Sequence, residues 1–248
     1  MAHYYDAKFM EYTSASSQYA ACKITKLVHE KLEIGSVLDV GCAHGTWLKS
    51  WSDVGVIDGF GVDGDYVKIE NLEFHAEKFL PLNLNEPFGL GRKFDLVQSL
   101  EVGEHIDPAS ADEFAKSIAS HAERFILFSA APPGQGGEFH INEETYDAWR
   151  QRFAVYGFDA FDWIRGQISD DKDISYWYRY NMFLYVKRDF ISCLPTDMHH
   201  YKVATSADLP DVSPWLFQLR KAIVRRLPNV VEHKIARLKT RFFPTGRF

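Results

Sequence analysis

The sequence has few cysteines and no long apolar run. Its three cysteines, Cys22, Cys42 and Cys193, are odd in number and widely spaced, which favours a reducing compartment without a disulfide framework. They form no C-x-x-C pair of the kind that zinc sites use. No uninterrupted apolar run reaches the roughly 18 residues of a membrane-spanning helix, and the N-terminus lacks the apolar core of a signal peptide. These absences predict a cytoplasmic protein.

The chain also lacks an overall positive charge. It carries 28 basic and 34 acidic residues, a net charge of −6 over 248 residues, which argues against a surface that binds nucleic acid throughout. The charge is uneven, because the segment 213–248 has nine basic residues and one acid, Glu232, while the rest carries −14. With 46% hydrophobic and 15% aromatic residues the composition is globular. We therefore expect one domain with appendages.

Short runs rich in Val, Leu, Ile and Phe alternate with helical patterns. The predicted strands are 35–40, 57–63, 78–84, 94–100, 124–130, 158–161 and 181–186. Pro81 predicts that the third strand is short or lies at an edge. Helical spacing covers residues 108–122, with Asp107 as N-cap, and a later stretch ending near Phe153 that Asn142 could cap. The alternation predicts an α/β sheet with right-handed crossovers.

A glycine-containing turn follows the first predicted strand. The strand ends at Asp39, glycines stand at positions 41 and 45, and a helical pattern begins directly afterwards. Glycine permits a close approach of backbone to ligand, and a helix N-terminus offers unpaired N–H groups. The G-x-G-x-x-G pattern of NAD enzymes is missing here. Since Asp39 would repel a pyrophosphate, the turn favours a ligand that carries an amine or another cation.

Polar groups also stand at the ends of the next two strands. Asp63 ends the second strand, where a carboxylate can accept both ribose hydroxyls of a nucleoside. Asn83 and Leu84 end the third strand, where an amide or a backbone group could meet an adenine edge. Turn glycines and strand caps explain each feature alone. Three of them at successive strand ends favour a nucleoside site.

Four motifs, VLDVGCAHGTWL, GVD, LNLNEPF and FDLVQSLEVGEHI, resemble those of class I S-adenosylmethionine-dependent methyltransferases over residues 35–186. The resemblance implies a Rossmann-like, seven-stranded, mostly parallel sheet with helices on both faces and an antiparallel last strand. It implies S-adenosylmethionine as the cofactor. By position, the cofactor site comprises Asp39, Gly41, Cys42 and Gly45 at the methionine part, Asp63 at the ribose, Asn83 and Leu84 at the adenine, and Ser99 and Leu100 beside the sulfonium.

The sequence departs from this family pattern in the turn and after the third strand. Ala43 replaces the usual middle glycine, His44 replaces a small polar residue, and position 83 is Asn where relatives often have Asp. Alanine is small enough that we expect cofactor binding to survive. The thiol of Cys42 we expect to be a small buried group without chemistry.

Two segments after the fourth and fifth predicted strands carry candidate catalytic groups. Glu101 and His105 are four residues apart and would share one face of a helical turn, where a histidine suits proton removal from a hydroxyl. For His105, packing beneath the cofactor and capping are equally open. The glycine-rich stretch 131–143 delivers His140, the favoured catalytic or acceptor-orienting group. The candidates for acceptor binding are Gln135, Asn142 and Tyr12.

The glycine-rich stretch and a later W-Y-R-x-N pattern, Trp177 to Asn181, resemble methyltransferases of glycan and secondary-metabolite pathways. This resemblance implies O-methylation of a sugar, a glycan precursor or another small molecule. An RNA acceptor or a non-catalytic cofactor-binding subunit stays an alternative. A divalent metal is disfavoured, because acidic clusters are more often solvated surface. Its candidate ligands would be Glu101, Glu104, His105, Asp107 and His140.

We expect three parts along the chain. Residues 1–34 would form the N-terminal helical lid that the resemblance implies, or pack their aromatic side chains on the sheet edge. Residues 35–190 would form the cofactor-binding domain, and 191–248 a C-terminal extension. From residue 215 onward, basic and apolar residues alternate as in an amphipathic helix that binds anionic lipid at the inner membrane face, or an acidic partner. Docking on the chain's own acidic body, or on a second copy in a homodimer, is slightly favoured over these.

Overall fold

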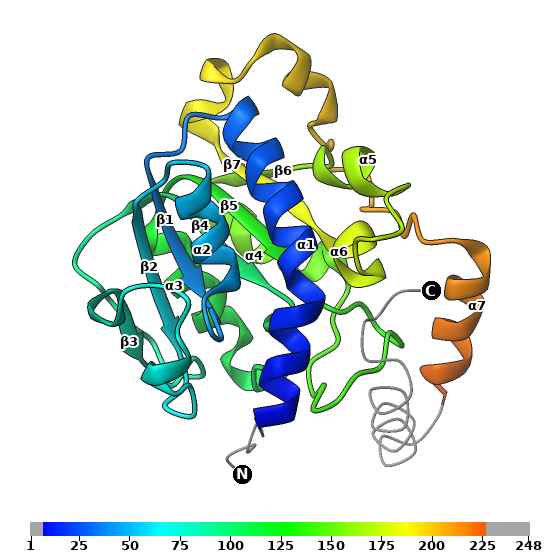
Figure 1. Cartoon of the computed structure of the whole chain (residues 1–248). Coiled ribbons are helices and arrows are strands. Elements are labelled where there is room, and N and C mark those ends of the chain that lie inside the picture. The colour runs from blue at the N-terminus through cyan, green and yellow to red at the C-terminus, as the bar shows by residue number, and fades with distance from the viewer. Residues whose placement is uncertain (1–6, 227–248) are drawn as a thin grey trace.

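The computed structural model describes residues 7–226 of the chain, with side chains from Ser17 onward. A single seven-stranded sheet forms its centre, in the order β3-β2-β1-β4-β5-β7-β6 (Figure 1). The strands are β1 (Ser36–Val40), β2 (Asp58–Asp63), β3 (Phe79–Pro81), β4 (Phe94–Leu100), β5 (Ala122–Ser129), β6 (Phe158–Phe161) and β7 (Phe183–Lys187). Strand β7 is antiparallel to both of its neighbours, β5 and β6, whereas the other strand pairs of this sheet are parallel. The predicted Rossmann-like architecture is confirmed.

Strand β3 has three residues and lies at the sheet edge, as Pro81 predicts, because proline cannot donate to a further strand. It ends three residues before the predicted end of this strand. The strand order reverses between β1 and β4, where Asp39 pairs with Gly61 on one side and Gln98 on the other. Such a reversal opens a crevice at the carboxyl ends of the strands, where α/β folds bind ligands.

Helices cover both faces of the sheet (Figure 1). They are α1 (Ala7–Lys31), α2 (Thr46–Asp53), α3 (Ala111–His121), α4 (Tyr146–Val155), α5 (Ile164–Ile168), α6 (Tyr176–Asn181) and α7 (Trp215–Val224), with short 3₁₀ turns between them. One buried cluster joins α1, α2, α5 and α6 to the sheet, and a second joins α3 and α4 to the opposite face. The alternation of β1 side chains places Val37 in the first cluster and Leu38 in the second.

Two predicted caps have different outcomes. Asp107 accepts a hydrogen bond from the Ala109 amide (2.9 Å) and so caps the 3₁₀ turn that precedes α3. The prediction that Asn142 caps α4 was wrong. Thr145 is the N-cap there, accepting from the Ala148 amide (3.2 Å), because Asn142 lies three residues too early and is buried.

Some predicted features lie outside the described residues. The side chain of Tyr12, a candidate for acceptor binding, is one of them, although its backbone belongs to α1. The basic tail is described only as far as Arg226. Between residues 7 and 226, no helix combines the length and the apolar character needed to cross a membrane.

Candidate active site

The turn between β1 and α2 needs its two glycines for backbone angle and for space. Gly41 has a φ of 86° and Gly45 a φ of 87°. A Cβ at Gly41 would stand 2.3 Å from the Val102 side chain, and one at Gly45 2.1 Å from the Phe74 ring. Ala43 also has a positive φ, 48°, a conformation that costs alanine more free energy than it costs glycine. The turn therefore keeps the backbone of a glycine-rich loop despite the alanine.

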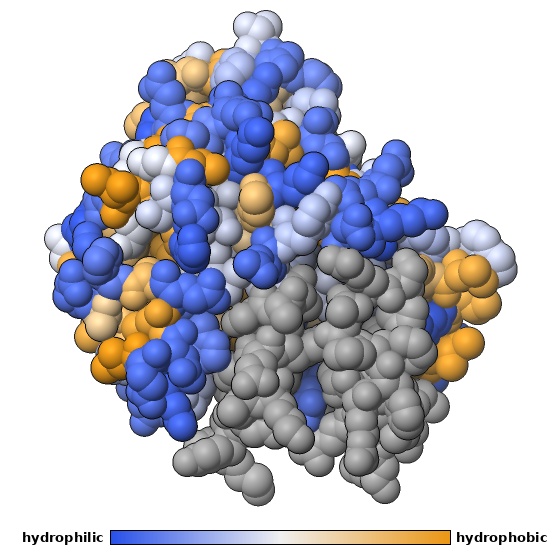
Figure 2. Space-filling view, viewed as in Figure 1, coloured by the Kyte–Doolittle hydropathy of each residue, from blue (hydrophilic) through white to orange (hydrophobic). Residues whose placement is uncertain are grey.

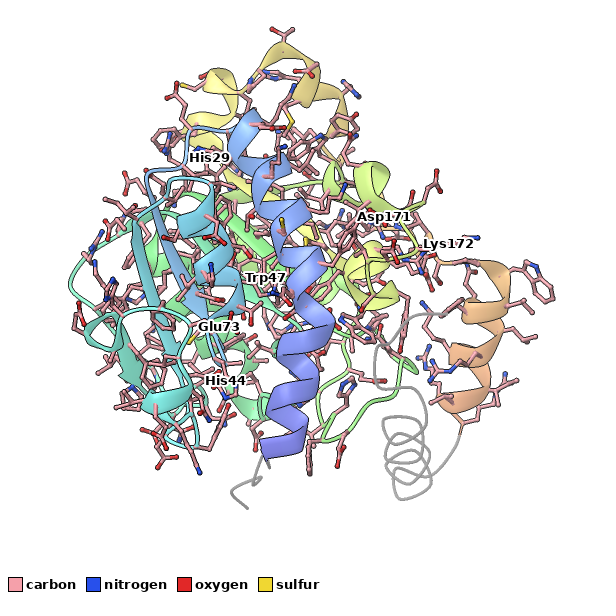
Figure 3. The ribbon with its side chains drawn as sticks, in the orientation of Figure 1. His29, His44, Trp47, Glu73, Asp171 and Lys172 are labelled. Atoms are coloured by element: carbon pink, nitrogen blue, oxygen red, sulfur yellow. The ribbon has the colours of Figure 1, made fainter. Side chains whose placement is uncertain are left out.

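The loop after β2 closes one side of this turn. The Glu73 amide donates to the His44 carbonyl (2.8 Å), and the Thr46 hydroxyl donates to the Glu73 carboxylate (2.8 Å). Figure 3 shows His44 and Glu73 close together in front of the sheet, with Trp47 at the start of α2 above them. The Trp47 ring meets the Tyr178 ring of α6 edge-on at 5.4 Å, so α6 closes the other side.

We predict that Gly45→Ala destabilises the fold by at least about 1 kcal/mol, because alanine is strained at this φ and clashes with Phe74. Gly166→Ala is the matched control, since that site is open and lies in helix α5, where alanine is the better helix former. Urea denaturation of both variants measures the effect. Equal free energies of unfolding for the two variants would contradict the prediction, because they would show that the turn accommodates alanine without loss of stability.

Asp39 is a buried carboxylate with one oxygen that lacks a hydrogen-bond partner in the described part of the chain. It is 3% exposed, and among the described residues its Oδ2 has no hydrogen-bond partner. Burial, together with the nearby charge of Asp63, raises its pKa from the ordinary 3.8 to about 7, although a hydrogen bond with the Gln98 side chain opposes the shift. A buried polar atom without a partner is rare in folded proteins. Asp39 Oδ2 could therefore accept a hydrogen bond from a ligand or pair with a cationic one.

Asp63 joins the end of β2 to the turn after β1. Its carboxylate accepts hydrogen bonds from the backbone amides of Ala43 and Gly64, both at 2.7 Å, and from the Tyr66 hydroxyl. Burial raises its pKa, and these hydrogen bonds oppose the shift. Burial also raises the pKa of the Cys42 thiol well above its ordinary value, so the thiolate is disfavoured as the sequence predicted.

The other predicted cofactor residues lie around the same strands but are engaged with the protein. Asn83 is exposed, accepts from the Asn85 amide (3.1 Å) and donates to Glu86 (2.8 Å). Leu84 packs in the buried cluster on the α3 side. The Ser99 hydroxyl donates to the Val40 carbonyl (2.9 Å) and ties β4 to β1, while Leu100 is buried in the opposite cluster.

Glu101 belongs to a buried polar network. Its carboxylate accepts from the amides of Gln135 (3.2 Å) and Asn181 (3.3 Å), and Asn181 also donates to Gln135 (2.9 Å). The Tyr146 hydroxyl donates to Asn181 (2.8 Å). Burial raises the pKa of Glu101, and hydrogen bonds from the network oppose this shift.

The predicted helical face shared by Glu101 and His105 was wrong. Glu101 has a φ of 57°, outside any helix, and the 3₁₀ turn begins only at Gly103. The His105 Nδ1 instead lies 3.3 Å from the carbonyl of Phe139, to which it donates. The two side chains thus contact different parts of the loop after β5, Glu101 at Gln135 and His105 at Phe139.

His140 is held by a carboxylate that the sequence prediction did not single out. Its Nδ1 donates to Glu143 Oε1 at 2.8 Å. Glu143 also accepts from the backbone amides of Gly134 and Gly136, both at 2.7 Å, so it shapes the glycine-rich loop as well. A neutral imidazole whose Nδ1 donates carries its basic lone pair on Nε2. The spacing of three residues was the available signal for this pair.

Glu104 faces His140 from the segment after β4. Its Oε1 lies 3.9 Å from His140 Nε2, and the carboxylate is 1% exposed. Burial raises its pKa well above the usual range, and the charges of Glu101 and Glu143 add to the shift. The ring of His105 stands perpendicular to that of His140, with centroids 5.0 Å apart.

Glu104, His105 and His140 lie close enough together to hold a metal ion, since one ligand atom of each lies within 4.8 Å of the other two. The other two predicted ligands do not join them. Glu101 is committed to Gln135 and Asn181, and Asp107 caps a helical turn.

Asn142 and Gln135, both predicted to bind the acceptor, are buried. Asn142 donates to the Gly103 carbonyl (3.1 Å) and thereby ties the glycine-rich loop to the segment after β4. Gln135 lies next to a small cavity between this loop, α6 and α7. The lining residues are Gln135, Tyr176, Tyr180, Asn181, Ser213, Phe217, Arg220 and Lys221. No sequence pattern indicated that α7 covers this loop.

Comparisons with known proteins agree with the fold. Residues 12–130 match a family described as a methyltransferase domain. No curated protein sequence matches the chain.

Several solved methyltransferase structures share the fold at low identity. The magnesium protoporphyrin IX methyltransferase ChlM of Synechocystis PCC 6803, with SAH bound, is 18% identical (TM-score 0.52; 69% of this chain, 84% of that one). The sugar N-methyltransferase KedS8 of Streptoalloteichus sp. ATCC 53650 is 15% identical (TM-score 0.53; 71% and 88%). The SAM-bound amino pentose methyltransferase CalS10 of Micromonospora echinaspora is 13% identical (TM-score 0.53; 75% and 99%).

Proposed function

The chain belongs to the S-adenosylmethionine-dependent methyltransferases, and from this premise we propose that it methylates a hydroxyl of a sugar or glycan precursor with His140 as general base. The observation that carries the proposal is the His140–Glu143 pair on the loop after β5, at the sheet edge where such folds bind ligands. Two of the structural neighbours are named as methyltransferases of a sugar and of an amino pentose.

The turn after β1 supports binding of the cofactor. The partnerless Asp39 Oδ2 suits the cationic methionine part, because a nearby positive charge offsets the cost of the buried carboxylate. Gly41 and Gly45 let the backbone approach it. Asp63 would receive the ribose hydroxyls, which join or replace the Tyr66 hydroxyl on its carboxylate. The adenine would lie at the segment that ends in Asn83 and Leu84, with Ser99 and Leu100 beside the sulfonium.

His140 would remove the acceptor's proton. The bound cofactor supplies a methyl group on a sulfonium, so the protein mainly has to align the acceptor hydroxyl and take its proton. Glu143 fixes the tautomer with a basic Nε2 and stabilises the imidazolium that forms, as the aspartate does in a catalytic triad. Glu101, Gln135 and Asn181 would orient the acceptor through the network that they form beside this loop.

We expect S-adenosylhomocysteine to raise the melting temperature and NAD to leave it unchanged, since a ligand that binds only the folded state stabilises it. Thermal denaturation with each compound measures this. Stabilisation by NAD alone would contradict the assignment of the turn after β1.

We expect turnover to persist after dialysis against EDTA, because the proposed base uses the Nε2 lone pair that a metal would occupy. The assay is methyl transfer to a panel of sugar acceptors, with and without added Mg²⁺ or Mn²⁺. Activity that disappears with EDTA and returns with metal would instead assign Glu104, His105 and His140 to a metal site.

A further inference from the structure

Helix α7 presents two faces with different surroundings. On its inner face, Arg220 Nη1 donates to the Gln135 carbonyl (2.9 Å), Lys221 pairs with Asp211 (2.5 Å) and the Phe217 ring meets the Tyr176 ring at 5.2 Å. The inner face is thus fastened to the glycine-rich loop and to α6. We define the outer face of α7 as Trp215, Leu216, Leu219 and Ile223.

The outer face is apolar and open to solvent. Its four side chains are 71%, 59%, 50% and 53% exposed, in chain order. Their spacing places them on one side of a helix, and Figure 2 shows the apolar patch over α7 at the side of the molecule. Exposed apolar residues such as Ile57 and Val155 stand singly elsewhere, which is ordinary for a protein surface, whereas a contiguous patch marks an interaction site.

Exposed basic residues follow this face along the chain. Arg220 and Lys221 are engaged on the inner face, but Arg225 and Arg226 at its C-terminal end are exposed, and the sequence that follows, 227–248, adds five basic residues against one acid. A helix with an apolar face and basic residues beside it fits the surface of an anionic bilayer, where the apolar side chains enter the headgroup boundary. Two-fold pairing of the same face with a second copy would instead bring like charges together.

We propose that the outer face of α7 binds the surface of an anionic lipid bilayer. Because the inner face is bonded to the glycine-rich loop through Arg220 and Gln135, docking would set that loop beside the membrane. The proposal stands independently of methyl transfer, since vesicle binding needs neither cofactor nor acceptor.

The first test is sedimentation of the full chain with vesicles of phosphatidylcholine, alone or mixed with phosphatidylglycerol. We expect binding to the mixed vesicles, weakened by salt, and at least about a tenfold loss in the variant Trp215→Ser/Leu219→Ser/Ile223→Ser. The matched control Ile57→Ser/Val155→Ser removes apolar residues that are 83% and 79% exposed and should bind as the unchanged chain does. Equal binding of both variants, or no binding to mixed vesicles, would overturn the proposal.

The second test uses the fluorescence of Trp215. Trp47, Trp51, Trp149 and Trp163 are buried and Trp177 is half-buried, so Trp215 reports on α7. Mixed vesicles should shift the emission to shorter wavelength, and Trp215→Phe should lose the shift while it still sediments with vesicles. The emission could instead shift with increasing protein concentration in the absence of lipid. Such a shift, if light scattering also gave the mass of a dimer, would assign the outer face to contact with a second copy.

Discussion

Asp39→Asn is expected to weaken binding of S-adenosylmethionine by about 10- to 100-fold at pH 8, because it removes the buried charge that faces the cationic ligand. In the unchanged protein the pKa of Asp39 is about 7, so the carboxylate forms as the pH rises through neutrality. Affinity should therefore increase between pH 6 and 8 in the unchanged protein and stay nearly constant in the variant. Binding of the ligand to both proteins is measured by calorimetry over this range. Because protonation of the ligand affects both proteins equally, the ratio of the two affinities reports on Asp39 alone.

The same substitution should stabilise the protein in the absence of ligand. The folded state holds the Asp39 proton more tightly than the unfolded state, whose pKa is near 3.8. Ionisation of Asp39 thus costs stability as the pH rises from about 4 to 7. At pH 8 we expect the free energy of unfolding of Asp39→Asn to be higher than that of the unchanged protein by on the order of a few kcal/mol. This difference should disappear near pH 4. A gap that does not depend on pH would show that Asp39 is paired and solvated.

His140→Ala is expected to lower turnover by about 10²-fold or more while the affinity for S-adenosylhomocysteine stays the same, because the imidazole acts on the acceptor's proton. Glu143→Gln should lower turnover by about tenfold or more, since the amide cannot stabilise an imidazolium as a carboxylate does. His105→Ala should have a smaller effect, because its Nδ1 donates to the Phe139 backbone carbonyl, which cannot stabilise an imidazolium as a carboxylate does.

The matched control is His75→Ala, which removes a histidine whose side chain is 85% exposed. Single-turnover methyl transfer separates the chemical step from product release. Normal turnover in His140→Ala would assign this residue to the structure of the glycine-rich loop. A loss in His105→Ala as large as that in His140→Ala would contradict the order of roles proposed here.

Local sequence patterns determined the architecture and the turn after β1. Strands buried on both faces appear as short apolar runs, so their positions could be predicted to within a few residues, and Pro81 indicated the edge strand because it lacks an N–H. Gly41, Gly45 and Asp39 could be identified because their roles depend on backbone angles and on a strand end within a few residues.

The acceptor side was decided by tertiary structure. Glu101 meets Asn181 across 80 residues, and Arg220 meets Gln135 across 85. Such contacts depend on how loops and helices pack, and no periodicity encodes them. Glu101 has a positive φ and its carboxylate is held in that packed network, so the predicted partnership with His105 did not form. The chain's pattern of residues thus determined the sheet and the turn after β1, while packing alone decided which side chains face one another beyond the strand ends and that α7 covers the glycine-rich loop.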